Sequence, residues 1–495
     1  MLFNSLSFLL FFPITTAIYF ALPRRFRWLH LLICSCAFYA AFVPAYLLIL
    51  LAVILIDYIA GLVIDRARGR ARRAFLIVSL VANIGVLAAF KYFNFVNANL
   101  AALAALIHWN YPVPNLGMLL PIGLSFHTFQ SMAYTIEVYR GRQKAERNLG
   151  IYALYVMFYP QLVAGPIERP QNLLHQFREP HPFDADRIFD GLKQMLWGFF
   201  KKLVIADRLS AVVDVFYADP RNTGGAYLVL ATWFFAIQIY CDFSGYTDIA
   251  IGAARVLGYR LSTNFDRPYA SRSVAEFWRR WHISLSTWFR DYLYIPLGGS
   301  RVRVPRWCFN VLVVFLISGM WHGASWTFAV WGALHGVYLI GSRLTEGLRG
   351  RVSSAVGLDR FPRIRAALRV LITFNLVALA WVFFRAATLG EAWAVLARSV
   401  KGGFRTMPDL RVGGAGAPAF TTPDLWIDAG LIVFLLLAEW LQSRSARAST
   451  PPATRPVWVL DRRPVWVRWP AYYGLLLLIL WIGALGGRTF IYFQF

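Results

Sequence analysis

The chain alternates between long apolar runs and short polar segments. Apolar runs of about 17 to 25 residues can cross the hydrocarbon core of a membrane as helices. This pattern predicts an all-α integral membrane protein with about 11–13 transmembrane or re-entrant helices, in one polytopic domain over residues 1–495. The thirteen candidate spans lie near 5–22, 28–45, 46–64, 74–91, 118–138, 148–165, 190–206, 225–243, 307–321, 326–342, 366–385, 426–442 and 471–487.

The short polar segments are mostly basic, and they predict an orientation. Loops on the cytoplasmic side of membrane proteins collect Lys and Arg. The basic segments 24–27, 66–73 and 140–147 alternate with the spans in a way that places all three on that side. The basic stretch 245–306 lacks an obvious span and should also face the cytoplasm if 148–165 is re-entrant. Both termini are then expected outside.

Composition supports this membrane assignment and limits the partners. The chain is 58% hydrophobic and 15% charged, whereas soluble proteins are about a quarter charged. The net charge of +25 lies in short runs between apolar segments and not on one soluble face, so nucleic acid is not an expected partner. The cysteines Cys34, Cys36, Cys241 and Cys308 lack metal-ligand spacing, so we expect neither a disulfide nor a bound metal.

Three histidines in the apolar part of the chain are candidates for chemistry, because ionisable groups inside a membrane are costly and often functional. They are His282, His322 and His335. His322 lies between an apolar run at 311–317 and another that begins at Trp326. A neutral imidazole there can accept a proton from a hydroxyl, as general-base acylation of an alcohol requires. An interhelical hydrogen bond explains His322 equally well from composition alone.

Other polar residues have simpler explanations. His335 has small apolar neighbours that are typical of helix packing. His127 is interpreted as a satisfied core histidine, with a cavity-lining role as the alternative. Asp242 and Asp248 follow a candidate span and are interpreted as helix caps, although they also suit the cytoplasmic mouth of a site. The pair Gly298–Gly299 predicts a turn and not a phosphate-binding loop.

Two tryptophan–histidine motifs give the chain a family resemblance. Residues 277–282 (FWRRWH) and 320–323 (MWHG) lie about forty residues apart. With them the chain resembles the membrane-bound O-acyltransferase family, and most closely its bacterial branch that O-acetylates alginate and peptidoglycan. The motif-bearing core spans about 118–342. Further matching motifs are PIGLSFHTFQ at 121–130, AGPI at 164–167, DFSGYTD at 242–248 and NFDRPY at 264–269.

The resemblance implies a funnel-shaped helical fold with His322 at its floor and His282 nearby. By this analogy His322 is the general base that activates the acceptor hydroxyl, while His282 positions substrate or shares the proton. The donor is then a cytoplasmic thioester, acetyl-coenzyme A, which is a substrate and not a bound cofactor. Arg279, Arg280 and Arg290 are candidates for its phosphates. Each of these arginines is also explained as positive-inside charge.

The last six residues, 490–495 (FIYFQF), form an aromatic tail that is expected outside. Aromatic side chains are at home at a membrane interface, so the tail is interpreted as an anchor. The resemblance offers a second interpretation, in which Tyr492 receives the acyl group and hands it on. The tail is similar to short C-terminal aromatic motifs in partner peptides of related D-alanyl-transfer systems.

The predicted function is therefore a membrane O-acetyltransferase that moves acetyl from cytoplasmic acetyl-coenzyme A to an exported polysaccharide such as alginate. Peptidoglycan or another cell-envelope glycan is the alternative acceptor. The expected location is the bacterial inner membrane, among lipid, with both termini periplasmic. The chain lacks a nucleophile elbow, so we expect a periplasmic SGNH or serine-hydrolase-like partner to complete the reaction. A proton-coupled transporter or flippase is the rival class, but the repeat symmetry typical of such proteins is not found.

Overall fold

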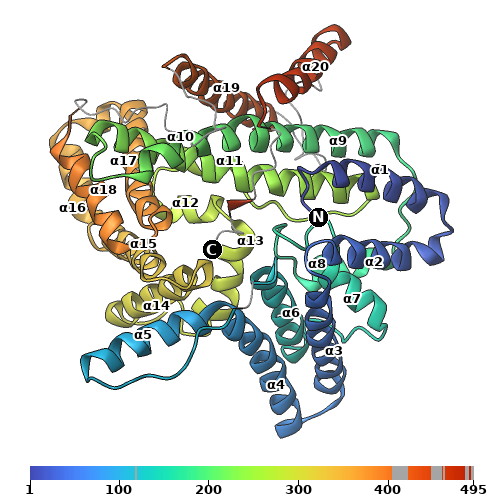
Figure 1. The fold of residues 1–495 in the computed structure, drawn as a ribbon. Coiled ribbons are helices and arrows are strands. Elements are labelled where there is room, and N and C mark those ends of the chain that lie inside the picture. Colours follow the sequence, from blue (N-terminus) through green and yellow to red (C-terminus); the bar gives the residue numbers. More distant parts are fainter. Residues whose placement is uncertain (118–119, 404–421, 448–459, 461–462, 485–489, 492–495) are drawn as a thin grey trace.

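The computed structural model describes residues 1–117, 120–403, 422–447, 460, 463–484 and 490–491, and every regular element in these residues is a helix (Figure 1). The predicted all-α membrane fold is confirmed. Within the described residues, six helical segments are long and apolar enough to cross a membrane. They are Pro44–Arg66, Gly69–Leu106, Gly225–Leu257, Val304–His322, Pro362–Arg385 and Val465–Ile482.

The N-terminal helices form one side of the molecule (Figure 1). They are α1 (Leu6–Ala21), α2 (Arg24–Ala40), α3 (Pro44–Arg66), α4 (Gly69–Leu87), the π-helical turn η1 (Ala88–Tyr92), α5 (Phe93–Leu106), α6 (Leu124–Tyr139) and α7 (Leu149–Met157). The sequence pattern missed α5. The nine residues of α7 are too few to cross a membrane at 1.5 Å per residue, so the segment 148–165 is not a full span, as expected.

A second group contains α11, the longest of the described helices, and its members α9–α11 run across the upper part of Figure 1, below α19 and α20. Gly191 and Gly198 of α9 face Gly252 and Gly245 of α11, and a Cβ on any of them would lie 2.6–2.8 Å from the opposite carbonyl oxygen. These glycines therefore let the two helices touch through their backbones. The group comprises α8 (Pro170–Leu173), η2 (Leu174–Arg178), α9 (Ala185–Phe199), η3 (Phe200–Ala206), α10 (Asp207–Ala218) and α11 (Gly225–Leu257).

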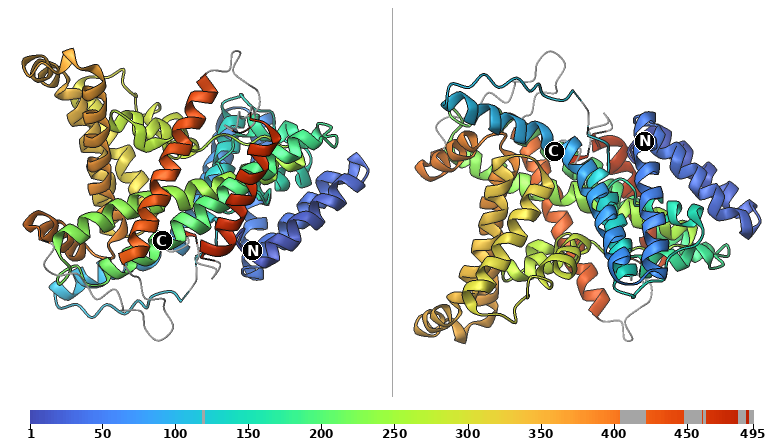
Figure 2. Two further views of the ribbon diagram at one scale, coloured as in Figure 1. Left: turned by 90° about the horizontal axis from the view of Figure 1, so that it is seen from above. Right: turned by 90° about the horizontal axis from the view of Figure 1, so that it is seen from below.

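The third group begins in the middle of Figure 1, where α12 and α13 lie, and continues through α14–α18 on the side opposite α1 and α2 (Figure 1, Figure 2). Helices α19 and α20 lie outside the α9–α11 layer (Figure 1). The remaining elements are η4 (Pro268–Ala270), α12 (Val274–Arg280), α13 (Ile283–Phe289), η5 (Arg290–Tyr294), α14 (Val304–His322), α15 (Trp326–Leu344), α16 (Glu346–Ala355), η6 (Leu358–Arg360), α17 (Pro362–Arg385), α18 (Leu389–Lys401), α19 (Thr422–Arg447) and α20 (Val465–Ile482).

The end of α11 corrects two predictions. The helix runs unbroken to Leu257, so Asp242 and Asp248 lie inside it and do not cap it. The stretch without a span consequently starts at Gly258 and not at Gly245. The sequence signal was misleading because Gly245 and its polar neighbours suggest a break, whereas this glycine serves the close contact with Gly198.

The outer faces of the long helices carry apolar side chains. Leu48 and Leu55 of α3, Ile84 of α4 and Leu371 of α17 are all exposed. Exposed apolar faces of this kind are costly in water and suit a lipid environment. The protein is therefore a multi-pass membrane protein.

Candidate active site

Helix α12 carries most of the first tryptophan–histidine motif, and two hydrogen bonds at its N-terminus, which resemble a capping box, set where it begins. The Oγ of Ser273 accepts a hydrogen bond from the Glu276 N–H at 3.1 Å. The Glu276 carboxylate in turn accepts from the Arg272 N–H at 2.8 Å. The helix ends at Arg280, and His282 then takes a left-handed backbone conformation with φ 43° and ψ 56°. This conformation is uncommon outside glycine, and strained residues cluster at functional sites.

The side chain of His282 is fixed in one orientation and one tautomer. Its Nδ1 lies 3.1 Å from Oδ1 of Asn264. The Ser284 N–H donates to the same oxygen at 3.2 Å, and the Ser284 hydroxyl does so at 2.9 Å. Because a backbone N–H can only donate, this atom of Asn264 is the oxygen, and Nδ1 of His282 must carry a proton. The lone pair of the neutral ring is therefore on Nε2.

Motifs far apart in the sequence meet at His282. The hydroxyl of Ser284 accepts from the Ile167 N–H at 3.1 Å, which joins α13 to the AGPI motif. The ring of Phe126 stacks on His282 at 6.0 Å, and that of Phe243 meets it edge-on at 4.7 Å. His282 is fully buried, and burial lowers its pKa to about 3, so it is neutral at physiological pH.

His322 is the last residue of α14 and is 3% exposed. Two side chains of η1 stabilise the end of this helix. The Lys91 ammonium donates to the carbonyls of Trp321 and His322 at 2.7 and 2.8 Å. The Tyr92 hydroxyl donates to the carbonyl of Met320 at 2.7 Å. Carbonyls at a helix C-terminus lack partners within the helix and favour a positive charge, so Lys91 supports the backbone beneath His322.

Both predicted catalytic histidines lie against Trp321. Its ring is 6.1 Å from that of His282 and 4.9 Å from that of His322. On the other side of His322, the ring of Trp331 lies 4.9 Å from His322 and 4.9 Å from His335. The structure thus brings together the three histidines that the sequence singled out.

The other histidine interpretations have different outcomes. His335 accepts a hydrogen bond from the indole N–H of Trp278 at 3.2 Å, as expected for a helix-packing residue. His127 is buried, but neither of its ring nitrogens has a hydrogen-bond partner among the described residues. The interpretation of His127 as a satisfied core histidine is therefore wrong.

Glycines allow α14 and α15 to come close beside His322. A Cβ on Gly319 would lie 2.2 Å from the carbonyl oxygen of Phe328. A Cβ on Gly323 would lie 2.1 Å from the Phe328 ring. Both glycines therefore let α15 approach the end of α14 closely.

Two cavities reach the histidine site. A chamber of about 50 Å³ is lined by His322, Trp321, Lys91, Val163 and residues 120–126. A larger cavity of about 1080 Å³ extends inward to Ser318. Ser318 lies four residues before His322 on α14, which is about one helical turn. His322 therefore lies at the chamber and close to the inner end of the large cavity.

The large cavity is lined by arginines from several elements. Two of the predicted donor-binding residues, Arg279 and Arg290, line it. Glu346 is the one acidic residue of the lining. The sequence did not single out the other arginines of the cavity as donor-binding residues. All of them except Arg272 lie in α15 to α17, far along the chain from Arg279. These other arginines are Arg272, Arg343, Arg349, Arg365 and Arg369.

Arg280 does not line this cavity, so the structure does not bring it together with Arg279 and Arg290, and its role in donor binding stays a prediction. Its guanidinium pairs with Glu276 at 2.7 Å. It lines a separate cavity together with Tyr240 and Glu439. In α12, side chains of adjacent residues point in directions about 100° apart, and Arg279 lines the large cavity whereas Arg280 lines the other one.

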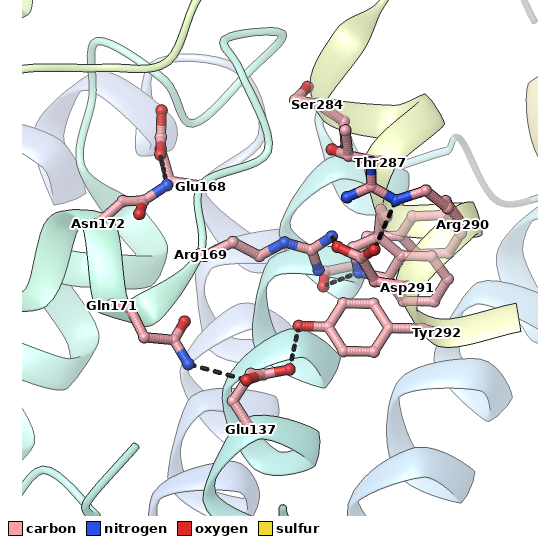
Figure 3. A network of polar contacts seen from close by, with 12 residues as sticks. Glu137, Glu168, Arg169, Gln171, Asn172, Ser284, Thr287, Arg290, Asp291 and Tyr292 are labelled. Atoms are coloured by element: carbon pink, nitrogen blue, oxygen red, sulfur yellow. Dashed lines mark hydrogen bonds and ion pairs between the residues drawn. The ribbon is translucent and has the colours of Figure 1, made fainter. Parts of the chain in front are cut away.

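A polar network holds η5 against the chain that follows the AGPI motif (Figure 3). Arg169 pairs with Asp291 at 3.2 Å, and its guanidinium lies 4.2 Å from the centre of the Tyr292 ring (Figure 3). The Tyr292 hydroxyl and the Gln171 amide both donate to Glu137 at 2.9 Å. Arg290, which lines the large cavity, is thereby attached to a rigid support.

Tyr492 lies outside the described residues. The two residues before it are described, and Phe490 and Ile491 are 1% and 4% exposed. The Phe490 ring lies 5.5 Å from that of Phe243, which itself contacts His282. The interpretation of the tail as an interfacial anchor is therefore wrong for Phe490.

Comparison with known proteins identifies the family of this chain. The sequence profile of the membrane-bound O-acyltransferase family matches residues 147–384, which include His282 and His322. The probable alginate O-acetylase of Pseudomonas aeruginosa is 41% identical over 397 residues, which is 79% of this chain and 74% of the relative. That of Pseudomonas putida is 36% identical over the full length of both chains. The peptidoglycan O-acetyltransferase of Helicobacter pylori is 35% identical over 80% of this chain and 79% of the relative. The chain therefore belongs to the membrane-bound O-acyltransferase family and is a many-pass membrane O-acyltransferase, as the paired tryptophan–histidine motifs predicted.

Proposed function

We propose that this protein transfers an acetyl group from cytoplasmic acetyl-coenzyme A through the membrane for O-acetylation of an exported polysaccharide such as alginate. One observation carries the proposal: His322 lies between a small chamber that it lines and a large arginine-lined cavity that ends one helical turn away. Transfer between a donor and an acceptor that approach from different sides requires a catalytic residue between the two spaces that they occupy. The names of the relatives support acetyl as the group, with alginate or peptidoglycan as acceptor.

His322 acts as the general base in this mechanism. Its neutral imidazole takes the proton of the acceptor hydroxyl while the hydroxyl oxygen attacks the thioester carbonyl carbon. The new C–O bond forms, the C–S bond breaks, and the proton passes to the leaving coenzyme A thiolate. His322 lines the chamber, whereas His282 is not part of its lining. We assign His282, held by Asn264, to positioning the substrate and sharing the proton.

The donor enters through the large cavity. Coenzyme A carries several phosphate groups, and arginine is well suited to bind them through paired hydrogen bonds. Arg279, Arg290 and Arg343 lie in the cavity wall, while Trp278 and Phe315 give an apolar lining for the uncharged arm of the donor. The positive-inside rule places this arginine-rich mouth on the cytoplasmic side of the inner membrane, with both termini periplasmic.

The acetyl group leaves by way of the C-terminal tail. Tyr492 follows directly after Ile491, which is buried, and the ring of the preceding Phe490 contacts Phe243, a neighbour of His282. In our proposal the Tyr492 hydroxyl is the first acceptor and becomes an acetyl ester. A periplasmic SGNH or serine-hydrolase-like partner then takes the acetyl group from this ester to the polysaccharide.

A labelling experiment in proteoliposomes tests this route. Purified protein is incubated with radiolabelled acetyl-coenzyme A, and its C-terminal peptide is analysed by mass spectrometry. The expected result is an acetyl group on Tyr492 in the wild type and none in Tyr492→Phe, with both proteins folded. A Tyr492→Phe protein that passes acetyl to the polysaccharide at the wild-type rate would exclude the relay. Transport of a solute without any acetyl turnover would contradict the enzyme itself.

A further inference from the structure

A π-helical turn directs two consecutive lysines onto α11. Lys201 of η3 pairs with Asp248 at 2.6 Å, and Lys202 pairs with Asp242 at 2.7 Å. Both lysines are buried. Successive residues of a regular α-helix point in directions about 100° apart, and the wider turn of a π-helix changes this spacing. Such turns occur frequently at functional sites.

Asp242 connects this charged cluster to the C-terminal segment. One carboxylate oxygen, Oδ1, faces the Lys202 ammonium, which also pairs with Asp207 at 2.9 Å. The other oxygen, Oδ2, accepts a hydrogen bond from the backbone N–H of Ile491 at 2.8 Å. Both oxygens of a buried carboxylate need donors, so the Ile491 N–H contributes to stabilising the charge of Asp242.

Ring contacts hold the same segment on the same helix. Phe490 stacks on Tyr246 of α11 with 4.7 Å between ring centres. It also lies 5.5 Å from Phe243, whose ring is 4.7 Å from His282. The segment is thus fixed at two adjacent residues, by the hydrogen bond from Ile491 to Asp242 and by the stacking of Phe490, and Phe243 lies between Phe490 and His282.

We propose that Asp242, oriented by Lys202, is a positioning residue that holds the C-terminal segment beside His282 so that the following residue is presented to the acetyl group. This inference rests on the proposed function. It gives a role to Asp242 of α11, which the sequence analysis interpreted as a helix cap. Asp242 acts through the tail and does not touch the reacting atoms.

The substitution Asp242→Asn tests the contact with little change in volume. An asparagine has one acceptor oxygen, and the Lys202 ammonium competes for it with the Ile491 N–H. If the oxygen faces Lys202, the amide NH₂ faces the Ile491 N–H and the hydrogen bond is lost. Lys202 keeps its partner Asp207, so the cluster retains an ion pair. Asp248→Asn is the matched control. It removes a similar ion pair on the same helix, the one between Asp248 and Lys201, and leaves Asp242 in place.

Hydrogen–deuterium exchange of the full-length protein in nanodiscs measures whether the tail is held, and it needs no substrate. We expect the peptide that contains Ile491 to exchange roughly tenfold faster or more in Asp242→Asn, the size expected for losing a hydrogen bond to a charged group. In Asp248→Asn it should exchange at the wild-type rate. An unchanged rate in Asp242→Asn, or an equal increase in Asp248→Asn, would overturn the proposal.

Acetyl-transfer kinetics provide the second measurement. Ile491→Pro removes the N–H donor and leaves the charged cluster untouched, whereas the control Ile491→Val keeps the donor. We expect kcat for acetyl transfer to fall about tenfold in Ile491→Pro and in Asp242→Asn, with an unchanged KM for acetyl-coenzyme A. A wild-type kcat in Ile491→Pro contradicts the positioning role. A wild type without any acetyl turnover would instead count against the proposed function and leave the exchange result standing.

Discussion

His282 and His322 are both buried, but different parts of the chain hold them. The tautomer of His282 is set by Asn264, whereas His322 depends on Lys91 and Tyr92 to complete the end of its helix. Each histidine therefore has supporting residues, one for His282 and two for the helix end at His322, whose removal should leave the imidazole in place and disturb its function.

Asn264→Leu removes the acceptor that fixes Nδ1 of His282. We expect kcat to fall by about tenfold or more, because the ring then loses its orienting hydrogen bond. The KM for acetyl-coenzyme A should stay the same, since Asn264 does not line the large cavity. Steady-state kinetics with purified protein check this, and a wild-type kcat would show that the tautomer of His282 has no role.

Lys91→Met leaves the carbonyls of Trp321 and His322 without their donor. We expect a loss of about 1–3 kcal/mol in the free energy of unfolding, the usual cost of unsatisfied buried polar groups. Thermal unfolding in detergent measures this, with Lys144→Met as the control because Lys144 is exposed. Equal melting temperatures for the two variants would contradict the supporting role of Lys91.

The sequence predicted the histidines but not their supporting residues. The tryptophan–histidine motifs are local patterns, and they identify His282 and His322 directly. Asn264 and Lys91 are distant in sequence from the groups they contact, and such pairings depend on tertiary structure. Lys91 still had a signal that was overlooked, since it is a single basic residue within a long apolar run.

Among the elements, α11 carries Asp242 of the charged cluster and Phe243, whose ring contacts His282. Each expected apolar segment contains a helix in the part that the structure describes, because apolar length is a strong local signal, although 148–165 is helical only over Leu149–Met157. The full length of α11 was missed, since Gly245 acts through its contact with Gly198 and not as a breaker. Sequence alone does not separate these two roles of glycine.

Gly245→Ala tests this contact between elements. The added Cβ would lie 2.8 Å from the carbonyl oxygen of Gly198, so α9 and α11 must move apart. We expect a destabilisation of about 1–3 kcal/mol, as for other overpacked sites. The control is Gly85→Ala in α4, where a Cβ meets nothing within 4 Å and the change should be neutral or slightly stabilising. Comparable melting temperatures for the two variants would contradict the backbone contact.

The large cavity, in which we propose that the donor binds, is lined by residues from helices that lie far apart in the sequence. No local sequence pattern links these residues. Arg279 and Arg290 come from the neighbourhood of the first motif, while Arg343 and Arg369 come from α15 and α17. Arginines at helix ends are also explained by membrane orientation, so nothing in the sequence groups these arginines together. Only their arrangement around one cavity favours a donor with several phosphates.

The double variant Arg279→Gln, Arg343→Gln removes two charges from this cavity. We expect the KM for acetyl-coenzyme A to rise about tenfold or more, because charge-assisted hydrogen bonds to phosphate are strong. Arg280→Gln is the matched control from the same motif, and its KM should not change, since Arg280 faces another cavity. A larger KM effect in Arg280→Gln than in the double variant would contradict the placement of the donor.

In the proposed function, His322 removes the proton from the acceptor hydroxyl during acetyl transfer. The most direct measurement is the rate of coenzyme A release from acetyl-coenzyme A by purified protein in nanodiscs, in the presence of the acceptor, for the wild type and His322→Ala. The predicted result is a loss of about 10²–10⁴-fold in kcat for His322→Ala, the usual contribution of a general base, in a protein that melts at the wild-type temperature. A folded His322→Ala protein that releases coenzyme A at the wild-type rate would contradict the account.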